Sequence, residues 1–235
     1  MSLYALIPAA GSGLRFASGQ GGAPKQYLPL AGKPMLWHAI RAVCSASMEA
    51  VFVILSAEDR LFERQDWSAF GAKLEPLYCG GGSRRDTVHN GLIAAMTAVD
   101  TDDWVLVHDA ARPCLPAADL ARLIAECSGD PVGGILALPV ADTVKRALRT
   151  EHQDGAYRIA GSEDRSRLWL AQTPQMFRAG LLAQALHHAG ENVTDEAGAI
   201  ESLGLQPRLV IGSRENLKVT YPEDLAIAAA ILARR

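Results

Sequence analysis

Short apolar segments of strand length recur along the chain, separated by segments with helical spacing of apolar residues. Residues 3–7, 51–55, 104–108 and 132–138 are apolar nearly throughout, which is typical of parallel strands that are covered on both faces. Apolar residues at i, i+3 and i+4 predict the helices. The other expected elements are strands near 74–78 and 210–212 and helices over about 34–44, 57–67, 83–95, 116–128, 178–189, 194–203 and 222–232.

This alternation predicts an α/β fold, a Rossmann-like three-layer α/β/α sandwich with a mainly parallel sheet. The alternation of strands and helices is interrupted between about 139 and 169, where two polar strands, 142–146 and 157–159, flank the polar turn 151–155. A hairpin with so many polar residues cannot have both of its faces buried in the core. We therefore expect a protruding β-arm at 139–169 within a single domain of residues 1–235. The arm either pairs with another subunit or is a solvated hairpin.

The first strand runs into PAAGSG at 8–13, where no side chain is larger than a proline ring. Small residues at the carboxyl end of a strand let backbone N–H groups approach an anion closely, and glycine tolerates positive φ angles. Two cations follow, Arg15 and Lys25, so we interpret the segment as a phosphate cradle. The residues fit neither a dinucleotide fingerprint, which needs a third glycine, nor a P-loop. An ordinary βα turn is the alternative.

Three polar segments follow buried strands: the one around Gly11, the glycine cluster 80–82 and the segment that begins at Asp109. In open parallel sheets, ligands bind outside the carboxyl ends of the strands. We therefore expect one site at this edge. Asp109 is the candidate ligand for Mg²⁺, which proteins hold through one or two carboxylates plus phosphate oxygens. The alternative is an aspartate that caps the following turn.

The overall charge limits the ligands that the chain can bind. Its 23 Lys and Arg against 26 Asp and Glu give a net charge of -3. This excludes a protein that coats nucleic acid, so an anion site must come from local clustering of cations. No apolar run approaches the roughly 20 residues of a membrane span, and no signal peptide is evident, so we expect a cytoplasmic protein. The clustered cations are Arg15, Lys25, Arg84, Arg85, Arg112 and Lys218.

Other chemistry finds less support in the sequence. No Ser/His/Asp or Cys/His arrangement for covalent catalysis stands out, and the histidines do not form a metal site. The triplet TDE at 194–196 has a structural explanation: Thr194 would be an N-cap and the acidic residues would lie in the first helical turn.

An ordered set of motifs then indicates a family. PAAGSGLR at 8–15, PKQY at 24–27, GGSRRDTV at 81–88 and HDAARP at 108–113 are followed by DTVK at 142–145, TPQ at 173–175, TDE at 194–196 and NLKVT at 216–220. Over nearly its whole length the chain closely resembles the 2-C-methyl-D-erythritol 4-phosphate cytidylyltransferases of non-mevalonate isoprenoid synthesis. Several of the motifs also resemble ribitol 5-phosphate cytidylyltransferases.

The resemblance assigns roles to individual residues of a nucleotidyltransferase domain. It implies a homodimer in which the β-arm completes the acceptor site of the neighbouring subunit. The implied catalytic residues, around the triphosphate of CTP, are Arg15, Lys25 and Lys218. The implied nucleotide-binding residues are Pro8, Ala9, Ala10, Gly11, Ser12, Gly13, Gly81, Gly82, Arg84, Thr87 and Asp109, of which Asp109 would face Mg²⁺. The implied residues for the polyol phosphate are Arg112, Thr143, Arg165, Thr173 and Thr194.

The chain departs from the family pattern in three places. Thr87 replaces the usual serine, Gly82 replaces a common acidic residue, and the loop from Arg15 to Lys25 is longer and richer in glycine. The implied reaction is direct in-line attack of the acceptor phosphate on the α-phosphorus of CTP. Because a phosphate monoester has its second pKa near 6, it is largely dianionic at neutral pH and needs no general base.

Three other functions remain as alternatives. The chain could be a cytidylyltransferase for another polyol phosphate, or a nucleotide-binding module without catalysis. A Rossmann dehydrogenase is disfavoured by the missing third glycine.

Overall fold

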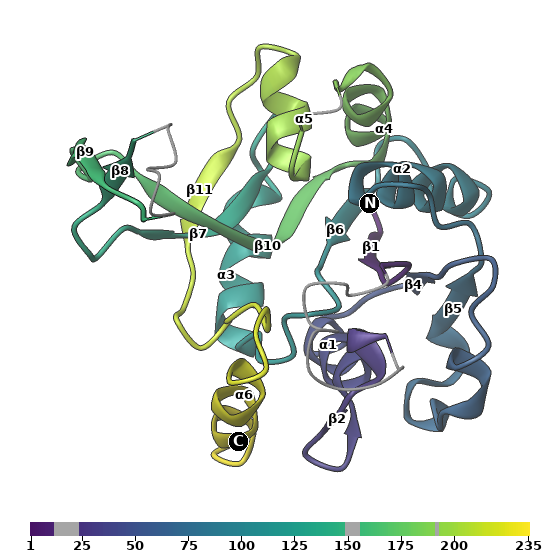
Figure 1. Ribbon diagram of the computed structural model, residues 1–235. Helices are drawn as coiled ribbons and strands as arrows, with labels where there is room; N and C mark the ends of the chain where they lie inside the picture. Colours follow the sequence, from purple (N-terminus) through teal and green to yellow (C-terminus); the bar gives the residue numbers. More distant parts are fainter. Residues whose placement is uncertain (12–23, 149–155, 191–192) are drawn as a thin grey trace.

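The structure is a computed structural model that describes residues 1–11, 24–148, 156–190 and 193–235. Within these ranges seven strands form one sheet, in the order β11-β7-β10-β6-β1-β4-β5 (Figure 1). The apolar runs of the sequence form its centre. The strands are β1 (Leu3–Pro8), β4 (Val51–Ile54), β5 (Leu74–Leu77), β6 (Trp104–Val107), β7 (Gly134–Pro139), β10 (Trp169–Arg178) and β11 (Arg208–Ile211).

The sheet is mainly parallel, as the sequence predicted. β1 pairs in parallel with β4 and β6, β4 with β5, and β7 with β11. β10 is the exception, because it lies antiparallel between β6 and β7. The sequence did not predict this strand, since Pro174 interrupts its apolar pattern and proline is disfavoured inside sheets. The strand accommodates Pro174 where its register against β7 shifts, between Ala171 and Gln175.

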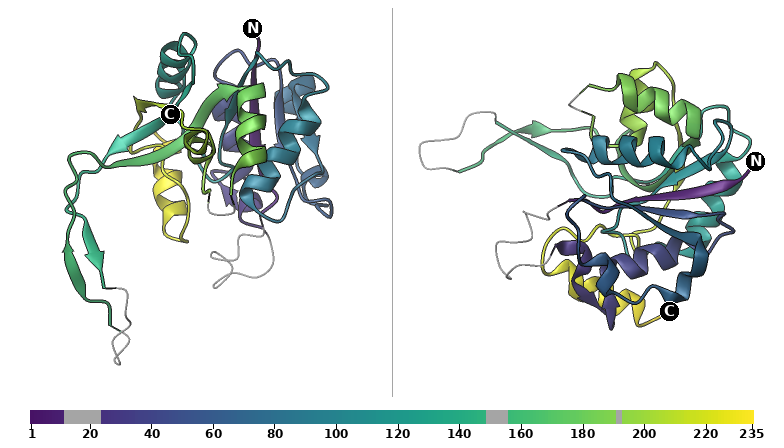
Figure 2. Two further views of the ribbon diagram at one scale, coloured as in Figure 1. Left: turned by 90° about the horizontal axis from the view of Figure 1, so that it is seen from above. Right: turned by 90° about the vertical axis from the view of Figure 1, so that its right-hand side faces the viewer.

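The predicted arm leaves the sheet as an antiparallel pair, β8 (Lys145–Ala147) and β9 (Ile159–Ser162). Figure 2 shows it extending well away from the body of the molecule. Every residue of β8 and β9 is exposed. The second strand begins at Ile159 rather than at the expected position 157, and the predicted turn 151–155 lies outside the described residues.

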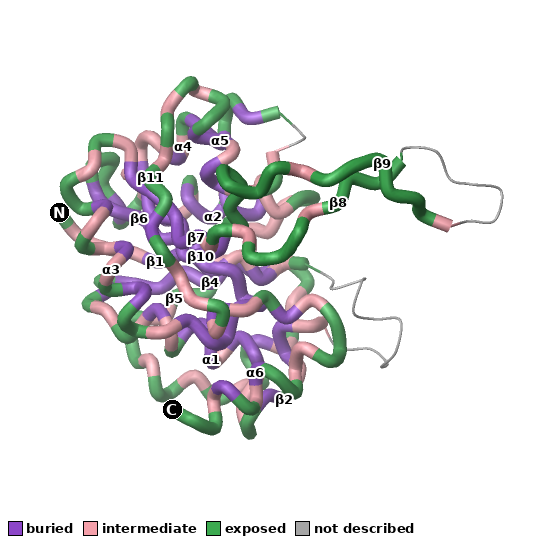
Figure 3. The backbone as a smooth tube through the Cα atoms, turned by 90° about the vertical axis from the view of Figure 1, so that its left-hand side faces the viewer, coloured by how far each residue is buried: buried purple, intermediate pink, exposed green. Residues whose placement is uncertain are grey.

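Alternating side chains of each strand pack against helices on opposite faces of the sheet. Ile7, Val53 and Leu106 face α1 and α3 in one core, while Leu6, Ile54 and Val107 face α2, α4 and α5 in the other. Buried residues accordingly follow the central strands in Figure 3, such as β4 and β6. This is the predicted three-layer sandwich. The helices are α1 (Met35–Val43), α2 (Arg84–Ala95), α3 (Ala117–Cys127), α4 (Ala179–His188), α5 (Glu196–Ser202) and α6 (Asp224–Leu232).

A smaller third core lies at the end of the molecule that carries α6. Leu30 and Met35 pack there with Val219, Ala228 and other residues. Leu30 belongs to the short hairpin of β2 (Pro29–Leu30) and β3 (Lys33–Pro34). This core fixes the segment that precedes α6. In the described parts of the chain, no helix is long and apolar enough to cross a membrane.

Two expectations about local structure were wrong. Residues 57–67 do not form a helix but contain only the 3₁₀ turn Phe62–Arg64 (η2). The Asp59 carboxylate accepts the N–H groups of Leu61 and Phe62, and Trp67 donates to the Phe62 carbonyl. Such side chain–backbone bonds compete with helix formation.

The second error concerns the start of α5. The N-cap is Asp195, whose carboxylate accepts the N–H of Gly198, and not Thr194. Aspartate is as good an N-cap as threonine, so the sequence pattern could not decide between neighbouring candidates.

Candidate active site

A cavity of about 450 Å³ opens at the carboxyl edge of the sheet, where a parallel sheet should place a site. The segments that follow β1, β5 and β6 all contribute to its wall. Small side chains and backbone alternate there with a few charged groups. The lining residues are Pro8, Ala9, Ala10, Gly11, Lys25, Gln26, Met35, Gly81, Gly82, Ser83, Arg84, Thr87, Asp109, Ala110, Ala111 and Lys218.

The cavity gathers most of the residues that the sequence assigned to the nucleotide. Every predicted nucleotide-binding residue within the described ranges lines it, and so do the predicted catalytic residues Lys25 and Lys218. Ser12, Gly13 and Arg15 lie outside the described residues. The lining residues that the sequence did not single out are Gln26, Met35, Ser83, Ala110 and Ala111.

Two glycines permit a close approach of the segments around the cavity. A Cβ atom on Gly80 would lie 2.3 Å from Ala10 Cβ and 2.9 Å from the Leu55 carbonyl oxygen, and one on Gly81 would lie 2.5 Å from Asp86 Cβ. Neither residue has a positive φ, and nor does Gly11. Gly80 and Gly81 therefore matter because they lack a side chain, and not because they adopt left-handed backbone.

The N-terminus of α2 faces the same cavity. Ser83 caps the helix by accepting the N–H of Asp86, at 3.0 Å. Thr87 is buried, and its hydroxyl accepts the N–H of Gly81 at 3.1 Å and donates to the Ser83 carbonyl at 2.9 Å. The Thr87 hydroxyl thus fixes the glycine segment against the helix. The positive end of a helix dipole at a cavity favours an anionic ligand.

Asp109 is the one carboxylate among the residues that line the cavity. Lys218 Nζ lies 2.8 Å from Asp109 Oδ2, and Arg84 Nη2 lies 3.0 Å from Oδ1. Arg112 Nε is 3.7 Å from Oδ2. Burial alone would raise the pKa of Asp109, but the charges of Arg84 and Lys218 outweigh burial and hold the pKa well below its usual range. The carboxyl is therefore ionised at neutral pH.

Arg84 is held on both sides by carboxylates. Its Nη1 and Nη2 donate to Glu196 at 2.6 and 3.0 Å, while Nε and Nη2 donate to Asp109. Burial acts to lower the pKa of Arg84, but Glu196 and Asp109 raise it. Glu196 is fully buried. The sequence pattern indicated only a helix-terminal role for Glu196, because no local pattern shows that α5 lies close to Arg84 of α2.

The segment that carries Lys25 is fixed by its neighbours. Lys25 Nζ donates to the Val219 carbonyl at 2.6 Å. Gln26, which is buried, donates to the Ala9 carbonyl at 2.7 Å, and the Tyr27 hydroxyl donates to Asp59 at the same distance. These bonds tie the 3₁₀ turn Lys25–Tyr27 (η1) to the segments that follow β1 and β4. Lys25 is thereby placed beside the backbone next to Lys218.

Arg112 and Thr173, both predicted to bind the polyol phosphate, are buried beside the cavity and do not line it. Arg112 Nη1 donates to the Asn216 carbonyl at 2.7 Å. The Thr173 hydroxyl lies 3.0 Å from the Asp109 N–H, from which it accepts, and 3.1 Å from His108 Nδ1. Both side chains therefore bond to the protein itself in this structure.

The remaining predicted acceptor residues lie on the surface. Thr143 and Arg165 are exposed on the arm segment, and Thr194 is exposed just before α5. None of the three lines the cavity. One chain thus brings the nucleotide-site residues together but leaves the arm residues apart from them.

Asp109 is the residue of the cavity wall that could hold Mg²⁺. The described residues contain no group of three or more His, Cys, Asp and Glu side chains that could hold a metal by themselves. Mg²⁺ bound to a nucleotide needs only one or two carboxylates besides phosphate oxygens and water. Asp109 supplies one ionised carboxylate in the cavity wall. Lys218, whose side chain is 47% exposed, has room to move from it. The residues fit a nucleotide-bound metal.

Together, the parallel sheet, the glycine-lined cavity and the cations around one carboxylate define a nucleotide-binding α/β protein. Comparison with known proteins is more specific. The chain belongs to the 2-C-methyl-D-erythritol 4-phosphate cytidylyltransferase family, whose model matches residues 3–234. It is therefore a cytidylyltransferase, an enzyme of the nucleotidyltransferase class, as its motifs suggested.

Curated relatives and solved structures agree over the whole chain. A 2-C-methyl-D-erythritol 4-phosphate cytidylyltransferase of Dechloromonas aromatica (strain RCB) is 55% identical over 233 residues, covering 99% of this chain and 98% of the relative. A crystal structure of 4-diphosphocytidyl-2C-methyl-D-erythritol synthase superposes with a TM-score of 0.83 at 38% identity, covering 98% of both chains. The Francisella tularensis enzyme superposes with a TM-score of 0.80 at 31% identity, covering 98% of this chain and 100% of that one.

Proposed function

We propose that the cavity at the carboxyl edge of the sheet is where this enzyme transfers the cytidylyl group of CTP to 2-C-methyl-D-erythritol 4-phosphate. Family membership gives the overall reaction, whose product is 4-diphosphocytidyl-2-C-methyl-D-erythritol. The location rests on one observation: Lys25, Lys218 and the ionised Asp109 share a cavity with two glycine segments and the N-terminus of α2. These are the groups that a triphosphate requires.

The mechanism that suits these residues is direct in-line attack. The acceptor phosphate is largely dianionic at neutral pH, so its oxygen attacks the α-phosphorus of CTP without a base, and pyrophosphate leaves. The main obstacle is the approach of two anions. Lys25 and Lys218 lie in the cavity wall and would neutralise charge that develops in the transition state. Arg15 is proposed to join them on the strength of the sequence motif alone.

A divalent cation, Mg²⁺ in our proposal, would be held by Asp109. When bound, it would neutralise charge on the phosphates of CTP. Arg84 and Arg112 keep the Asp109 carboxylate ionised and in place for this role.

The arm points to a second copy of the chain. Its surface carries large apolar side chains, with Tyr157 82% and Ile159 66% exposed, and Leu170 is 58% exposed at its base. Solvated hairpins do not need such side chains, whereas subunit interfaces do. We propose a homodimer in which Thr143 and Arg165 of one arm reach the acceptor bound to the partner. Sedimentation of the wild type and of Ile159→Lys tests this: a dimer is expected for the wild type and a smaller species for the variant.

The decisive experiment measures pyrophosphate release from CTP and Mg²⁺ with 2-C-methyl-D-erythritol 4-phosphate and ribitol 5-phosphate in parallel. Release only with the first acceptor is the expected result. Release only with the second would keep the mechanism but change the acceptor. CTP binding without release in either reaction would contradict the proposal and favour a binding module. The proposed cytoplasmic location is tested by fractionating cells and assaying each fraction.

A further inference from the structure

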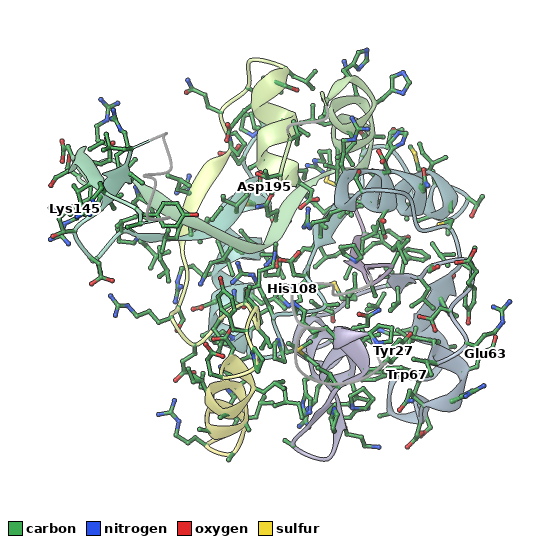
Figure 4. The ribbon with its side chains drawn as sticks, viewed as in Figure 1. Tyr27, Glu63, Trp67, His108, Lys145 and Asp195 are labelled. Atoms are coloured by element: carbon green, nitrogen blue, oxygen red, sulfur yellow. The ribbon has the colours of Figure 1, made fainter. Side chains whose placement is uncertain are left out.

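His108 is a buried histidine that does not line the cavity, although it directly precedes Asp109. It follows β6 and is completely inaccessible to solvent, near the centre of the molecule (Figure 4). Both of its ring nitrogens have partners. Nε2 is 3.0 Å from the Arg112 carbonyl oxygen, and Nδ1 is 3.1 Å from Thr173 Oγ1. A histidine in this position can influence the cavity only through the residues it bonds to, Arg112 and Thr173.

The partners of the ring determine the direction of each hydrogen bond. A carbonyl oxygen only accepts, so Nε2 carries the hydrogen that bonds to Arg112. In the neutral ring Nδ1 is then an acceptor, and the Thr173 hydroxyl donates its single hydrogen to it. The Thr173 oxygen remains free to accept the N–H of Asp109, at 3.0 Å. Every donor and acceptor in this chain of bonds is matched.

The bonds form a closed path around one turn of the backbone. The Arg112 N–H donates to the Asp109 carbonyl at 3.0 Å, which closes the turn from inside. The path through Thr173 and His108 joins the same two residues from the other side. The backbone of Asp109 is therefore fixed at both its N–H and its carbonyl.

Thr173 also ties this turn to the segment that carries Lys218. The Thr173 carbonyl accepts from Asn216 Nδ2 at 2.8 Å. It is free to do so because Thr173 lies where the register of β10 against β7 shifts. Such irregularities often occur beside active sites, where they direct groups out of the regular ladder. Thr173 thus bonds to both segments whose side chains meet in the Lys218–Asp109 ion pair.

We propose that His108 and Thr173 are positioning residues for Asp109: the Thr173 hydroxyl, oriented by His108, holds the Asp109 backbone so that its carboxylate faces Lys218. The inference rests on the proposed function of the cavity. The sequence resemblance assigned Thr173 to direct contact with the substrate. Here its buried hydroxyl donates its single hydrogen to His108 and accepts the N–H of Asp109, so it could contact a substrate only by accepting a hydrogen.

The test combines steady-state kinetics with hydrogen exchange at the Asp109 amide. We compare Thr173→Val, Thr173→Ser, His108→Gln and the double variant Thr173→Val/His108→Gln, with Thr97→Val, which changes an exposed threonine in the turn after α2, as control. Thr173→Val and His108→Gln are expected to lower kcat about tenfold or more with KM for both substrates changed by less than about threefold, since misplaced groups cost rate. Thr173→Ser is expected to restore most of the loss. The double variant Thr173→Val/His108→Gln should have a kcat no lower than that of the more impaired single variant, because both residues act through the same bond.

Hydrogen exchange keeps the inference testable apart from activity. The Asp109 amide is expected to exchange at least about tenfold faster in Thr173→Val and His108→Gln than in the wild type, with global unfolding measured in parallel. A raised KM for the acceptor with normal kcat would overturn the inference in favour of direct binding, as would normal kcat together with unchanged exchange. An inactive wild type would instead contradict the proposed function, and the exchange data would still decide the role of Thr173.

Discussion

Lys218 Nζ lies 2.8 Å from Asp109 Oδ2, joining the segment before α6 to the segment after β6 at the wall of the cavity. The lysine is half exposed and the carboxylate is nearly buried. The pair is therefore asymmetric: Lys218 can turn toward a phosphate while Arg84 still neutralises Asp109. The ion pair holds the lysine ammonium at the cavity wall in this structure.

Replacing Lys218 with alanine should lower kcat about 10²–10³-fold, because a preorganised cation is lost from the transition state. The melting temperature should change little, since an ion pair with an exposed partner contributes little stability. Pyrophosphate release and thermal unfolding measure the two effects. Lys33→Ala, which removes the exposed partner of Asp66, is the control. Normal turnover of Lys218→Ala would remove this residue from the catalytic set.

Gly81→Ala should weaken CTP binding, because the new Cβ would lie 2.5 Å from Asp86 Cβ and displace the first turn of α2. Such overpacking costs roughly 1–3 kcal/mol, which would correspond to about 5- to 150-fold in KM for CTP if the whole cost falls on binding. Gly82→Ala has no atom within 4 Å of its Cβ and should have a smaller effect. Equal effects of the two substitutions would show that crowding at α2 is not the cause.

Glu196→Gln should destabilise the protein and lower kcat together. The substitution leaves the positive charge of Arg84 with Asp109 as its remaining carboxylate partner. Removing one partner of a buried pair costs about 3–5 kcal/mol where the other charge is left uncompensated, so the loss should be smaller here because Asp109 remains. Urea unfolding and kcat measure the result. Glu201→Gln, an exposed residue of the same helix, is the matched control. A stability loss without a change in kcat would confine Glu196 to a structural role.

The free energy of unfolding should fall on acidification from about pH 7 to about pH 5, in part because of His108. Burial lowers the pKa of this histidine to about 4, against about 6.5 in the unfolded chain. Between these values the unfolded state binds more protons, so stability is lost as pH falls, by about 2 kcal/mol over this interval. Urea titrations at the two pH values measure the loss. In His108→Asn, which cannot titrate there, the pH dependence should be weaker; an unchanged dependence would contradict the assignment to His108.

The sequence predicted the parts of the fold that depend on local pattern. The strands that end near Pro8 and Asp109 are apolar runs, and parallel topology alone brings their carboxyl ends together. The sequence did not predict β10, because Gln172, Pro174 and Gln175 interrupt its apolar pattern. Their places are set by partners distant in sequence: Gln175 Nε2, for example, donates to Asp195 at 2.9 Å.

The site was predicted to a similar extent and for the same reason. Small residues and cations at strand ends identify the cavity, because their chemistry shows in the sequence. The bond from Arg84 to Glu196 joins residues that no local pattern relates. The bonds of Thr173 to His108 and to the Asp109 amide also join residues far apart in the sequence, so no local pattern shows them.

β10 has a further consequence for how this enzyme can vary. Its first residues, Trp169 and Leu170, lie at the exposed base of the arm, and its later residues, such as Phe177, lie in the core. Thr173 stands between them. The exposed base of the arm and the hydroxyl that bonds to the Asp109 amide therefore lie on one continuous stretch of backbone. We expect substitutions at the base of the arm to change turnover as well as the proposed subunit association, because the same strand carries both.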